Sequence, residues 1–128
     1  MFRRIDHVEI VPSDFEKTIT FYTEILGFRQ RARQGVDNPP VEEIAYLELG
    51  DTVVEIISVA NPAPSAKEAW QVGYRGIALE VQDMESAVEY LKTRGIEITW
   101  GPVNLGTSLR AELKDPDGLS IELRQWFS

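Results

Sequence analysis

The sequence has 128 residues, of which 43% are hydrophobic and 27% charged, ordinary values for one globular domain. Its formal net charge of −8 argues against nucleic-acid binding, because contact with phosphates requires a basic surface. The absence of cysteine excludes disulfides and thiolate metal sites, and no apolar run is long enough to span a bilayer. The N-terminus lacks the apolar core of a signal peptide, so we expect a cytoplasmic protein without a membrane partner.

The first half of the chain predicts a strand, a helix and three further strands. Residues 5–11 alternate as a strand does, and Ser13 and Glu16 then have the spacing of a helix-capping box. Phe15 opens an apolar stripe at helical spacing, and Gly27 stands where a helix end favours a left-handed residue. The further strands are expected at residues 28–34, 44–49 and 52–59, with a loop at 36–40.

The second half repeats this order after a linker expected at residues 61–72. A strand is predicted at residues 74–81, followed by a helix that Asp83 caps and Gly95 ends. The remaining strands are expected at residues 96–100, 109–114 and 119–123. The last two are joined by Asp115-Pro116-Asp117-Gly118, which is a strong turn signal.

Matching positions indicate that the second half duplicates the first. The pairs are a strand residue, a helix cap, a helix-ending glycine and a strand carboxylate: Val8 with Ile77, Asp14 with Asp83, Gly27 with Gly95 and Glu55 with Glu122. We therefore predict an α+β fold in which residues 1–128 form a single domain of two βαβββ modules, at residues 1–60 and 74–128. The modules would form a cupped mixed β-sheet with the helices on the outside.

The alternation of strand residues also predicts which side chains face the cup. His7 and Glu9 lie opposite the helix-facing residues of the first strand, while Glu55 and Glu122 face the cup from the last strand of each module. Imidazole and carboxylate groups are suitable ligands for a divalent metal. Glu55 is the strongest signal, because its neighbours on that face are apolar and an unpaired buried carboxylate is costly. Glu122 has polar neighbours that could solvate it or pair with it.

Three arginines, Arg29, Arg31 and Arg33, share one face of the strand predicted at residues 28–34. They could meet an anionic substrate in the cup, but alternating charge on an exposed strand face is the interpretation that we favour. No serine has the neighbours of a hydrolase nucleophile, and the glycines form no phosphate-binding signature.

Five segments, at residues 5–10, 21–28, 53–56, 76–81 and 114–123, resemble the glyoxalase/bleomycin-resistance/extradiol-dioxygenase (vicinal oxygen chelate) superfamily. The resemblance covers nearly the whole chain, and its most specific part is the Asp-Pro-Asp-Gly turn followed by Glu122. It implies paired βαβββ modules around a metal-binding cup, usually in a homodimer.

The resemblance also implies a set of site residues. His7, Glu55 and Glu122 match metal-ligand positions of the superfamily, with zinc, nickel, cobalt, manganese or iron as the divalent ion. The fourth ligand position falls on Gly76, which has no side chain, so Glu9, Tyr74, water or another residue would have to substitute. This departure leaves open a cup that binds no metal.

Two classes of function therefore follow from the sequence. The first is a glyoxalase-like, metal-dependent lyase or isomerase, in which Glu122 or Glu55 moves a proton next to a metal-polarised carbonyl of a small molecule. The alternative is a metal-free small-molecule-binding or drug-sequestering protein of the bleomycin-resistance type. We favour the enzyme, because Glu55 on an apolar face calls for a cation.

Overall fold

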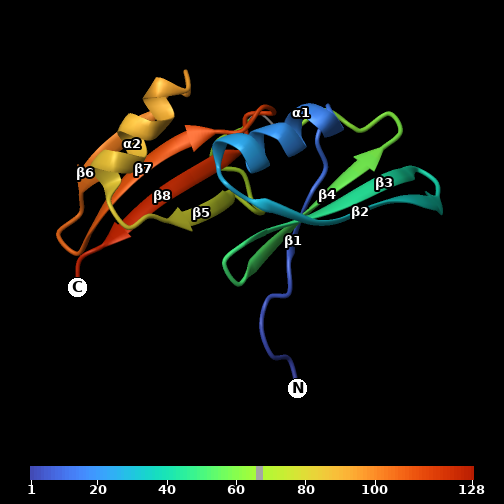
Figure 1. Ribbon diagram of the computed structural model, residues 1–128, viewed down its shortest axis with the longest axis horizontal. Helices are drawn as coiled ribbons and strands as arrows, with labels where there is room; N and C mark the ends of the chain where they lie inside the picture. The colour runs from blue at the N-terminus through green and yellow to red at the C-terminus, as the bar shows by residue number, and fades with distance from the viewer. Residues whose placement is uncertain (66–67) are drawn as a thin grey trace. The chain divides into compact units, whose positions relative to one another are not determined.

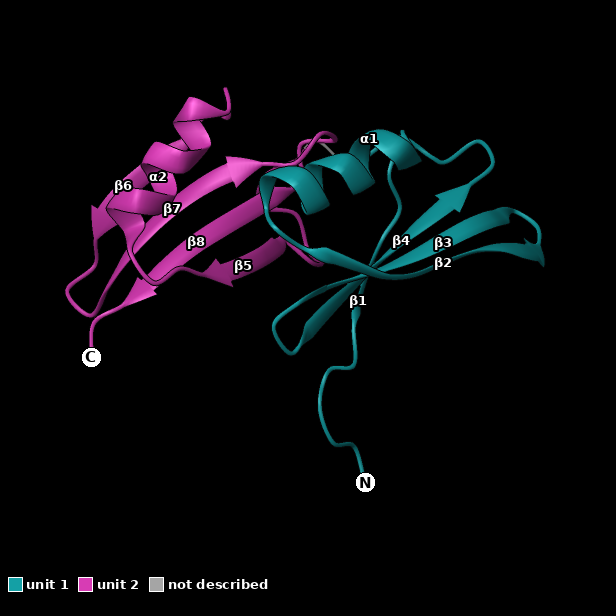
Figure 2. Ribbon diagram, viewed as in Figure 1, with its two compact units in different colours: residues 1–65 teal, residues 66–128 magenta. Residues whose placement is uncertain are grey.

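The computed structural model describes residues 1–65 and 68–128 of the chain (Figure 1). These residues form two compact units, Met1–Ser65 and Ala66–Ser128, shown in teal and magenta in Figure 2. Each unit contains a four-stranded mixed sheet and one helical segment, so the predicted α+β class is confirmed. The linker expected at residues 61–72 falls at the boundary of the units, and its residues 66 and 67 lie outside the described ranges.

The first unit runs from strand to helix and then to three strands. Its elements are β1 (Val8–Ile10), α1 (Phe15–Thr20), the π-helical turn η1 (Phe21–Ile25), β2 (Arg29–Asn38), β3 (Val41–Leu49) and β4 (Thr52–Val59). The strand order in the sheet is β1-β4-β3-β2, with β1 parallel to β4 and the other pairs antiparallel. The helix α1 packs against β4, so one face of this sheet is covered and the other carries the cup-facing residues of the sequence prediction.

The helix of the first unit begins one residue later than the capping-box prediction. Asp14 is the N-cap, and its carboxylate accepts a hydrogen bond from the backbone N–H of Lys17 at 3.1 Å. Glu16, which was expected to complete the box, forms an ion pair with Arg33 of β2 instead. A guanidinium within reach offers Glu16 a charge-assisted bond, which is stronger than a bond to a neutral backbone N–H.

The core of the first unit lies between its helix and the covered face of its sheet. Tyr22, Leu47 and Ile56 are completely buried there, and Tyr22 meets Phe28 edge-on with ring centroids 5.7 Å apart. Val8 was predicted to pack on the helix, yet it is 40% exposed. The reason is the length of β1, which has three residues instead of the seven predicted, so Val8 stands at its exposed end.

The second unit repeats the order of elements. It contains β5 (Gly76–Glu80), α2 (Met84–Thr93), β6 (Trp100–Asn104), β7 (Ser108–Lys114) and β8 (Ser120–Trp126), with the strand order β5-β8-β7-β6. The cap prediction is confirmed, because the Asp83 carboxylate accepts from the backbone N–H of Ser86 at 2.9 Å. The predicted apolar stripe of this helix is also buried: Met84, Val88 and Leu91.

The strands β6 and β2 also differ from their predicted positions. The strand expected at residues 96–100 lies at Trp100–Asn104, and its pairing with β7 is irregular between Trp100 and Val103. The strand β2 continues to Asn38 through most of the predicted loop, because it pairs with β3 up to Val41. Over the described ranges, no helix has the length and apolar character needed to cross a membrane.

Candidate metal centre

Pairing between β1 and β4 brings three predicted or suggested metal ligands together in the first unit. The strands are parallel, and Glu9 is the register partner of Glu55. The Nε2 atom of His7 lies 3.2 Å from Oε1 of Glu55 and 3.3 Å from Oε2 of Glu9. One ligand atom from each of the three side chains lies within 4.8 Å of the others. The predicted pair His7 and Glu55 is therefore joined by Glu9, which the sequence had suggested only as a substitute.

Two further side chains contact the cluster of His7, Glu9 and Glu55. Asp6 lies on the other side of the imidazole, with its Oδ2 2.8 Å from Nδ1 of His7. Tyr46, the register partner of Glu55 on β3, is hydrogen-bonded to the Glu55 carboxylate and meets the His7 ring edge-on at 5.8 Å between centroids. Carboxylate–histidine pairs of this kind fix the ring and leave Nε2 to act as the ligand.

Charges around the imidazole shift its titration. The hydrogen bond to Asp6 is the largest influence and raises the pKa of His7 above its ordinary value. Burial acts against it, and the Glu9 hydrogen bond and the Glu55 charge add to the rise. The hydrogen bond to Glu55 likewise raises the pKa of Tyr46, with burial adding to it. Tyr46 therefore remains a phenol that donates to Glu55 near neutral pH.

The group is open on one side. The side chain of Glu55 is 9% exposed and that of His7 is 24% exposed, whereas that of Glu9 is 61% exposed. Glu55 is thus a buried carboxylate in contact with His7 and Tyr46, while Glu9 is largely exposed to solvent. A positive charge beside Glu55, either an imidazolium or a metal ion, offsets the cost of burying that carboxylate.

The donor set and its spacing fit a divalent metal ion. Zinc binds histidine nitrogen and carboxylate oxygen at about 2.0–2.2 Å, so neighbouring ligands of one tetrahedral ion lie roughly 3.3–3.6 Å apart. The distances of 3.2 and 3.3 Å from His7 Nε2 to the two carboxylates are close to this spacing. Three protein ligands would leave coordination positions for water or for substrate oxygens.

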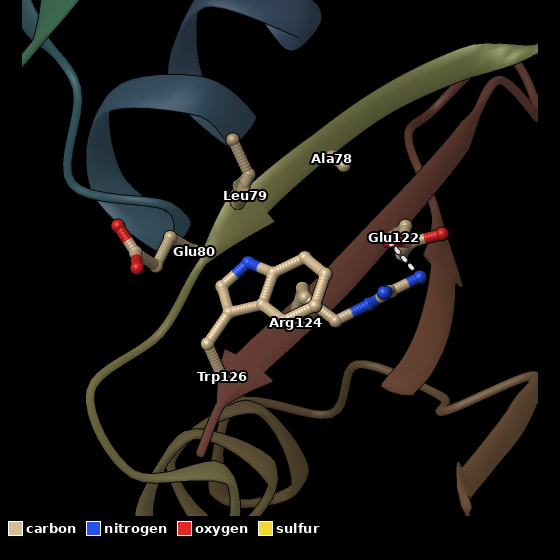
Figure 3. Close-up of a pocket in the computed structure, with 6 residues that line it drawn as sticks. All are labelled: Ala78, Leu79, Glu80, Glu122, Arg124 and Trp126. Carbon is tan, nitrogen blue, oxygen red and sulfur yellow. Dashed lines mark ion pairs between the residues drawn. The ribbon is translucent and has the colours of Figure 1, made fainter. Parts of the chain in front are cut away.

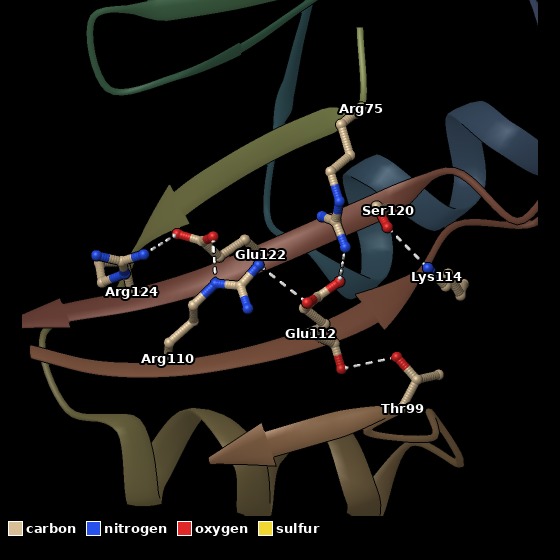
Figure 4. A network of polar contacts seen from close by, with 8 residues as sticks. All are labelled: Arg75, Thr99, Arg110, Glu112, Lys114, Ser120, Glu122 and Arg124. Atoms are coloured by element: carbon tan, nitrogen blue, oxygen red, sulfur yellow. Dashed lines mark hydrogen bonds and ion pairs between the residues drawn. The ribbon is translucent and has the colours of Figure 1, made fainter. Parts of the chain in front are cut away.

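The third predicted ligand, Glu122, lies in the second unit among arginines. On β8 its Oε1 accepts from Nε of Arg110 at 2.5 Å, and its Oε2 is paired with Arg124 at 3.0 Å. Arg110 also binds Glu112 at 2.9 Å, and Arg75 binds the other oxygen of Glu112 at 3.1 Å (Figure 4). Glu122 thus has the arginine pairing that the sequence left open as an alternative.

A cavity of about 320 Å³ opens beside Glu122 (Figure 3). Its lining residues come from β5 and β8: Ala78, Leu79, Glu80, Glu122, Arg124 and Trp126. The guanidinium of Arg124 stacks over the Trp126 ring at 4.9 Å, and Arg110 stacks over Trp100 at 4.8 Å. Glu122 is therefore a carboxylate at the wall of a small-molecule-sized cavity, held by two stacked arginines.

Gly76 occupies the fourth ligand position implied by the resemblance. It is the register partner of Ser120, and a Cβ added at Gly76 would lie 2.2 Å from the Ser120 carbonyl oxygen. The close approach of these two backbones leaves space only for glycine. The second unit therefore offers no ligand at this position, and no larger side chain fits there unless β5 moves.

Asp6 and Tyr46 were missed by the sequence reasoning. The hairpin around Gly50-Asp51 places Tyr46 opposite Glu55, so the strand register was a usable signal for this residue. Asp6 has no such signal, because its side chain reaches His7 from an extended segment before β1. The favoured interpretation is consistent with the structure for two of the three arginines of β2, since Arg29 pairs with Glu48 and Arg33 pairs with Glu16 and Glu43. Arg31 instead lies over the ring of Tyr46 at 5.5 Å.

Comparisons with known proteins agree on one family. A family model described as the Glyoxalase/Bleomycin resistance protein/Dioxygenase superfamily matches residues 4–123. A lactoylglutathione lyase of Escherichia coli O157:H7 is 31% identical over 94% of this chain and 90% of its own length. The chain spans only 44% of the Arabidopsis thaliana lactoylglutathione lyase GLX1, to which it is 30% identical.

Solved structures extend this agreement to the fold. A glyoxalase family protein from Enterococcus faecalis matches with a TM-score of 0.83 at 27% identity, covering 96% of this chain and 98% of that one. TnmS3, an antibiotic binding protein from Streptomyces sp. CB03234, matches with a TM-score of 0.79 at 25% identity, covering 98% of each chain. The chain belongs to the glyoxalase/bleomycin resistance protein/dioxygenase superfamily.

Proposed function

We propose that the protein is a metal-dependent lyase or isomerase that moves a proton next to the carbonyl group of a small molecule. The observation that carries the proposal is the convergence of His7, Glu9 and Glu55 in the first unit, with Asp6 orienting the histidine. The relatives named lactoylglutathione lyase support the same class of reaction.

The substrate class that we propose is the hemithioacetal of a 2-oxoaldehyde and a thiol. A proton leaves the carbon that bears sulfur and hydroxyl, and a proton is added to the neighbouring carbonyl carbon. The hydroxyl proton is lost from the first oxygen and a proton is gained by the second, which gives a 2-hydroxy thioester. The first carbon is oxidised and the second is reduced, so the isomerisation needs no external oxidant or reductant. A bound divalent metal supplies Lewis-acid stabilisation of the negative charge that develops on oxygen.

The residues of the chain divide the remaining work. His7 and Glu55 are the proposed metal ligands, as the sequence indicated, and Asp6 keeps Nε2 of the imidazole directed at the carboxylates. The sequence assigned two roles to Glu122, metal ligand and proton carrier. Its place on the cavity wall supports the second role, because a carboxylate at hydrogen-bonding distance from a substrate carbon acid acts as a general base. Arg110 orients this carboxylate.

A metal-free small-molecule-binding protein is the second candidate. The observation that favours it is that both predicted ligand carboxylates are paired within the chain, Glu55 with His7 and Glu122 with Arg110. The structural likeness to TnmS3, an antibiotic binding protein, points in the same direction. In that case the cavity beside Trp126 would bind the ligand without catalysing a reaction.

Metal analysis combined with an activity assay separates the two candidates. Natively purified protein is analysed for bound metal, stripped with a chelator, and assayed with the hemithioacetal of methylglyoxal and glutathione before and after nickel or zinc is restored. The enzyme proposal expects near-stoichiometric metal, loss of thioester formation on stripping, and recovery with metal. Absence of metal uptake and of thioester formation would exclude the enzyme and leave the binding protein.

Substitutions at the site test which residues bind the metal. His7→Ala and Glu55→Ala should abolish metal uptake, because each removes a ligand. Glu42→Ala is the matched control, since Glu42 is an exposed carboxylate of β3 outside the site. If the control lost metal as the site variants do, the uptake would reflect non-specific binding to an acidic surface.

We also propose that the modules at residues 1–60 and 74–128 act as one functional domain over residues 1–128, and that the protein is a homodimer. Support comes from the repeated order of elements in the two units and from the family. Light scattering coupled to size-exclusion chromatography tests the second statement, and a monomer mass would refute it.

A further inference from the structure

The two oxygens of Glu122 are already occupied by cationic groups. Arg110 donates to Oε1 at 2.5 Å, and Arg124 is paired with Oε2 at 3.0 Å. The side chains of Glu122 and Arg110 are each 19% exposed, so this contact is largely shielded from water. A metal ion at Glu122 would have to displace a guanidinium or share the carboxylate with it, and the two cations repel each other.

Arg110 is held in place on three sides. It contacts both Glu122 and Glu112, and it stacks over the ring of Trp100 at 4.8 Å. The hydrogen bond to Glu122 raises the pKa of Arg110 further, so the guanidinium stays charged. Withdrawing one partner from a shielded ion pair is strongly unfavourable, because the other charge is left without compensation. Arg110 therefore supplies Glu122 with the cation that a metal would otherwise provide.

In contrast to Glu122, the carboxylate of Glu9 has no arginine partner in the part of the chain that the structure describes. Its side chain is 61% exposed, and within residues 1–65 and 68–128 its carboxylate has one polar side-chain contact, with Nε2 of His7 at 3.3 Å. Glu9 also comes from β1 directly beside Glu55 of β4. A carboxylate at this position can turn towards a cation between His7 and Glu55 without breaking another ion pair.

We propose that Glu9, and not Glu122, completes the protein ligand set of the metal with His7 and Glu55. This inference rests on the metal dependence in the proposed function, and it changes where the metal is held. Glu9 then comes from β1, His7 from the position directly before that strand and Glu55 from β4, so all three ligands lie within the first unit. Gly76 is then no longer a missing ligand, and Glu122 keeps its two arginine partners.

Zinc titration by calorimetry tests the proposal without any measurement of activity. Glu9→Gln keeps the size and polarity of the side chain and removes its charge, and should weaken zinc binding by about 10- to 100-fold. Glu122→Gln should leave the zinc Kd within about threefold of the wild-type value. Glu42→Gln controls for the loss of one negative charge from the surface.

The outcomes separate this inference from the proposed function. Zinc binding weakened by Glu122→Gln as strongly as by Glu9→Gln, or unchanged by Glu9→Gln, would overturn the ligand assignment while the metal enzyme stands. A wild-type protein that takes up neither zinc nor nickel would overturn both.

A second variant covers the case in which Glu122→Gln does not fold. Arg110→Gln combined with Glu122→Gln removes both charges of this pair, so Arg110 is not left without its Glu122 partner, and Glu112 keeps its ion pair with Arg75. The double variant should also bind zinc as the wild type does, and a tenfold or greater loss of its zinc affinity would overturn the assignment.

Discussion

Substitution of Gly76 by histidine should destabilise the protein without improving metal binding. The added Cβ would lie 2.2 Å from the Ser120 carbonyl oxygen, whereas real Cβ contacts essentially never fall below 3.0 Å. The strands β5 and β8 must therefore separate by at least 3.0 − 2.2 Å, or about 0.8 Å, at Gly76. Overpacking of this kind costs about 1–3 kcal/mol. The same substitution places an imidazole at the position where the superfamily resemblance implies a ligand.

Urea unfolding and zinc calorimetry measure the two parts of this prediction. Gly76→His and Gly76→Ala should lose similar free energy of unfolding, because both introduce the Cβ that meets Ser120. Gly35→Ala is the matched control: its nearest atom would be 4.0 Å away, an ordinary contact, and it should be close to neutral. A Gly76→His variant as stable as the wild type would refute the steric argument, and one with tighter zinc binding would refute the assignment of the metal to the first unit.

Three other perturbations test the groups around the site. Asp6→Asn should weaken zinc binding by about 10- to 100-fold, because Asp6 orients the His7 ring. The variant should still fold, because Asp6 is exposed. Calorimetry measures the zinc affinity and circular dichroism the folding. Tyr46→Phe should cost about 1–3 kcal/mol in urea unfolding, because it leaves the buried Glu55 without its phenol donor, and an unchanged midpoint would contradict this. Burial raises the pKa of Glu112, but its arginine partners outweigh that effect and bring the net pKa below the ordinary value. The ionised Glu112 carboxylate therefore stabilises the fold at pH values above its pKa in the unfolded chain, and this stabilisation is lost as the pH falls through its lower pKa in the folded protein. Glu112→Gln should accordingly reduce the loss of stability at acidic pH, measured by thermal unfolding.

Periodicity alone predicted the parts of the fold that depend on strand and helix faces. The alternation of residues placed His7 and Glu55 on one face, and the structure brings these side chains within 3.2 Å of each other. The Asp83 cap follows from local chemistry, because a short carboxylate at this position can accept the free N–H groups of the first helical turn. These features need no knowledge of distant residues.

Features that depend on side chains from several strands were not predictable in this way. The pairing of Glu122 with Arg110 requires the register of β7 against β8 and the rotamers of both side chains. The helix cap at Asp14 was displaced from the predicted box because Arg33, seventeen residues from Glu16, takes that carboxylate. The position of β6 depends on an irregular pairing around Trp100 that no alternation pattern encodes.

The stacking of tryptophan on arginine in the second unit has an optical consequence. The sequence has three tryptophans, and each ring lies against a guanidinium of that unit: Trp70 with Arg75, Trp100 with Arg110 and Trp126 with Arg124. Residues 1–65 contain none, so indole emission reports on the second unit, and changes at His7 act on a part of the chain without an intrinsic indole fluorophore. Emission and far-ultraviolet dichroism followed during one denaturation would therefore show whether the two units melt together or in turn.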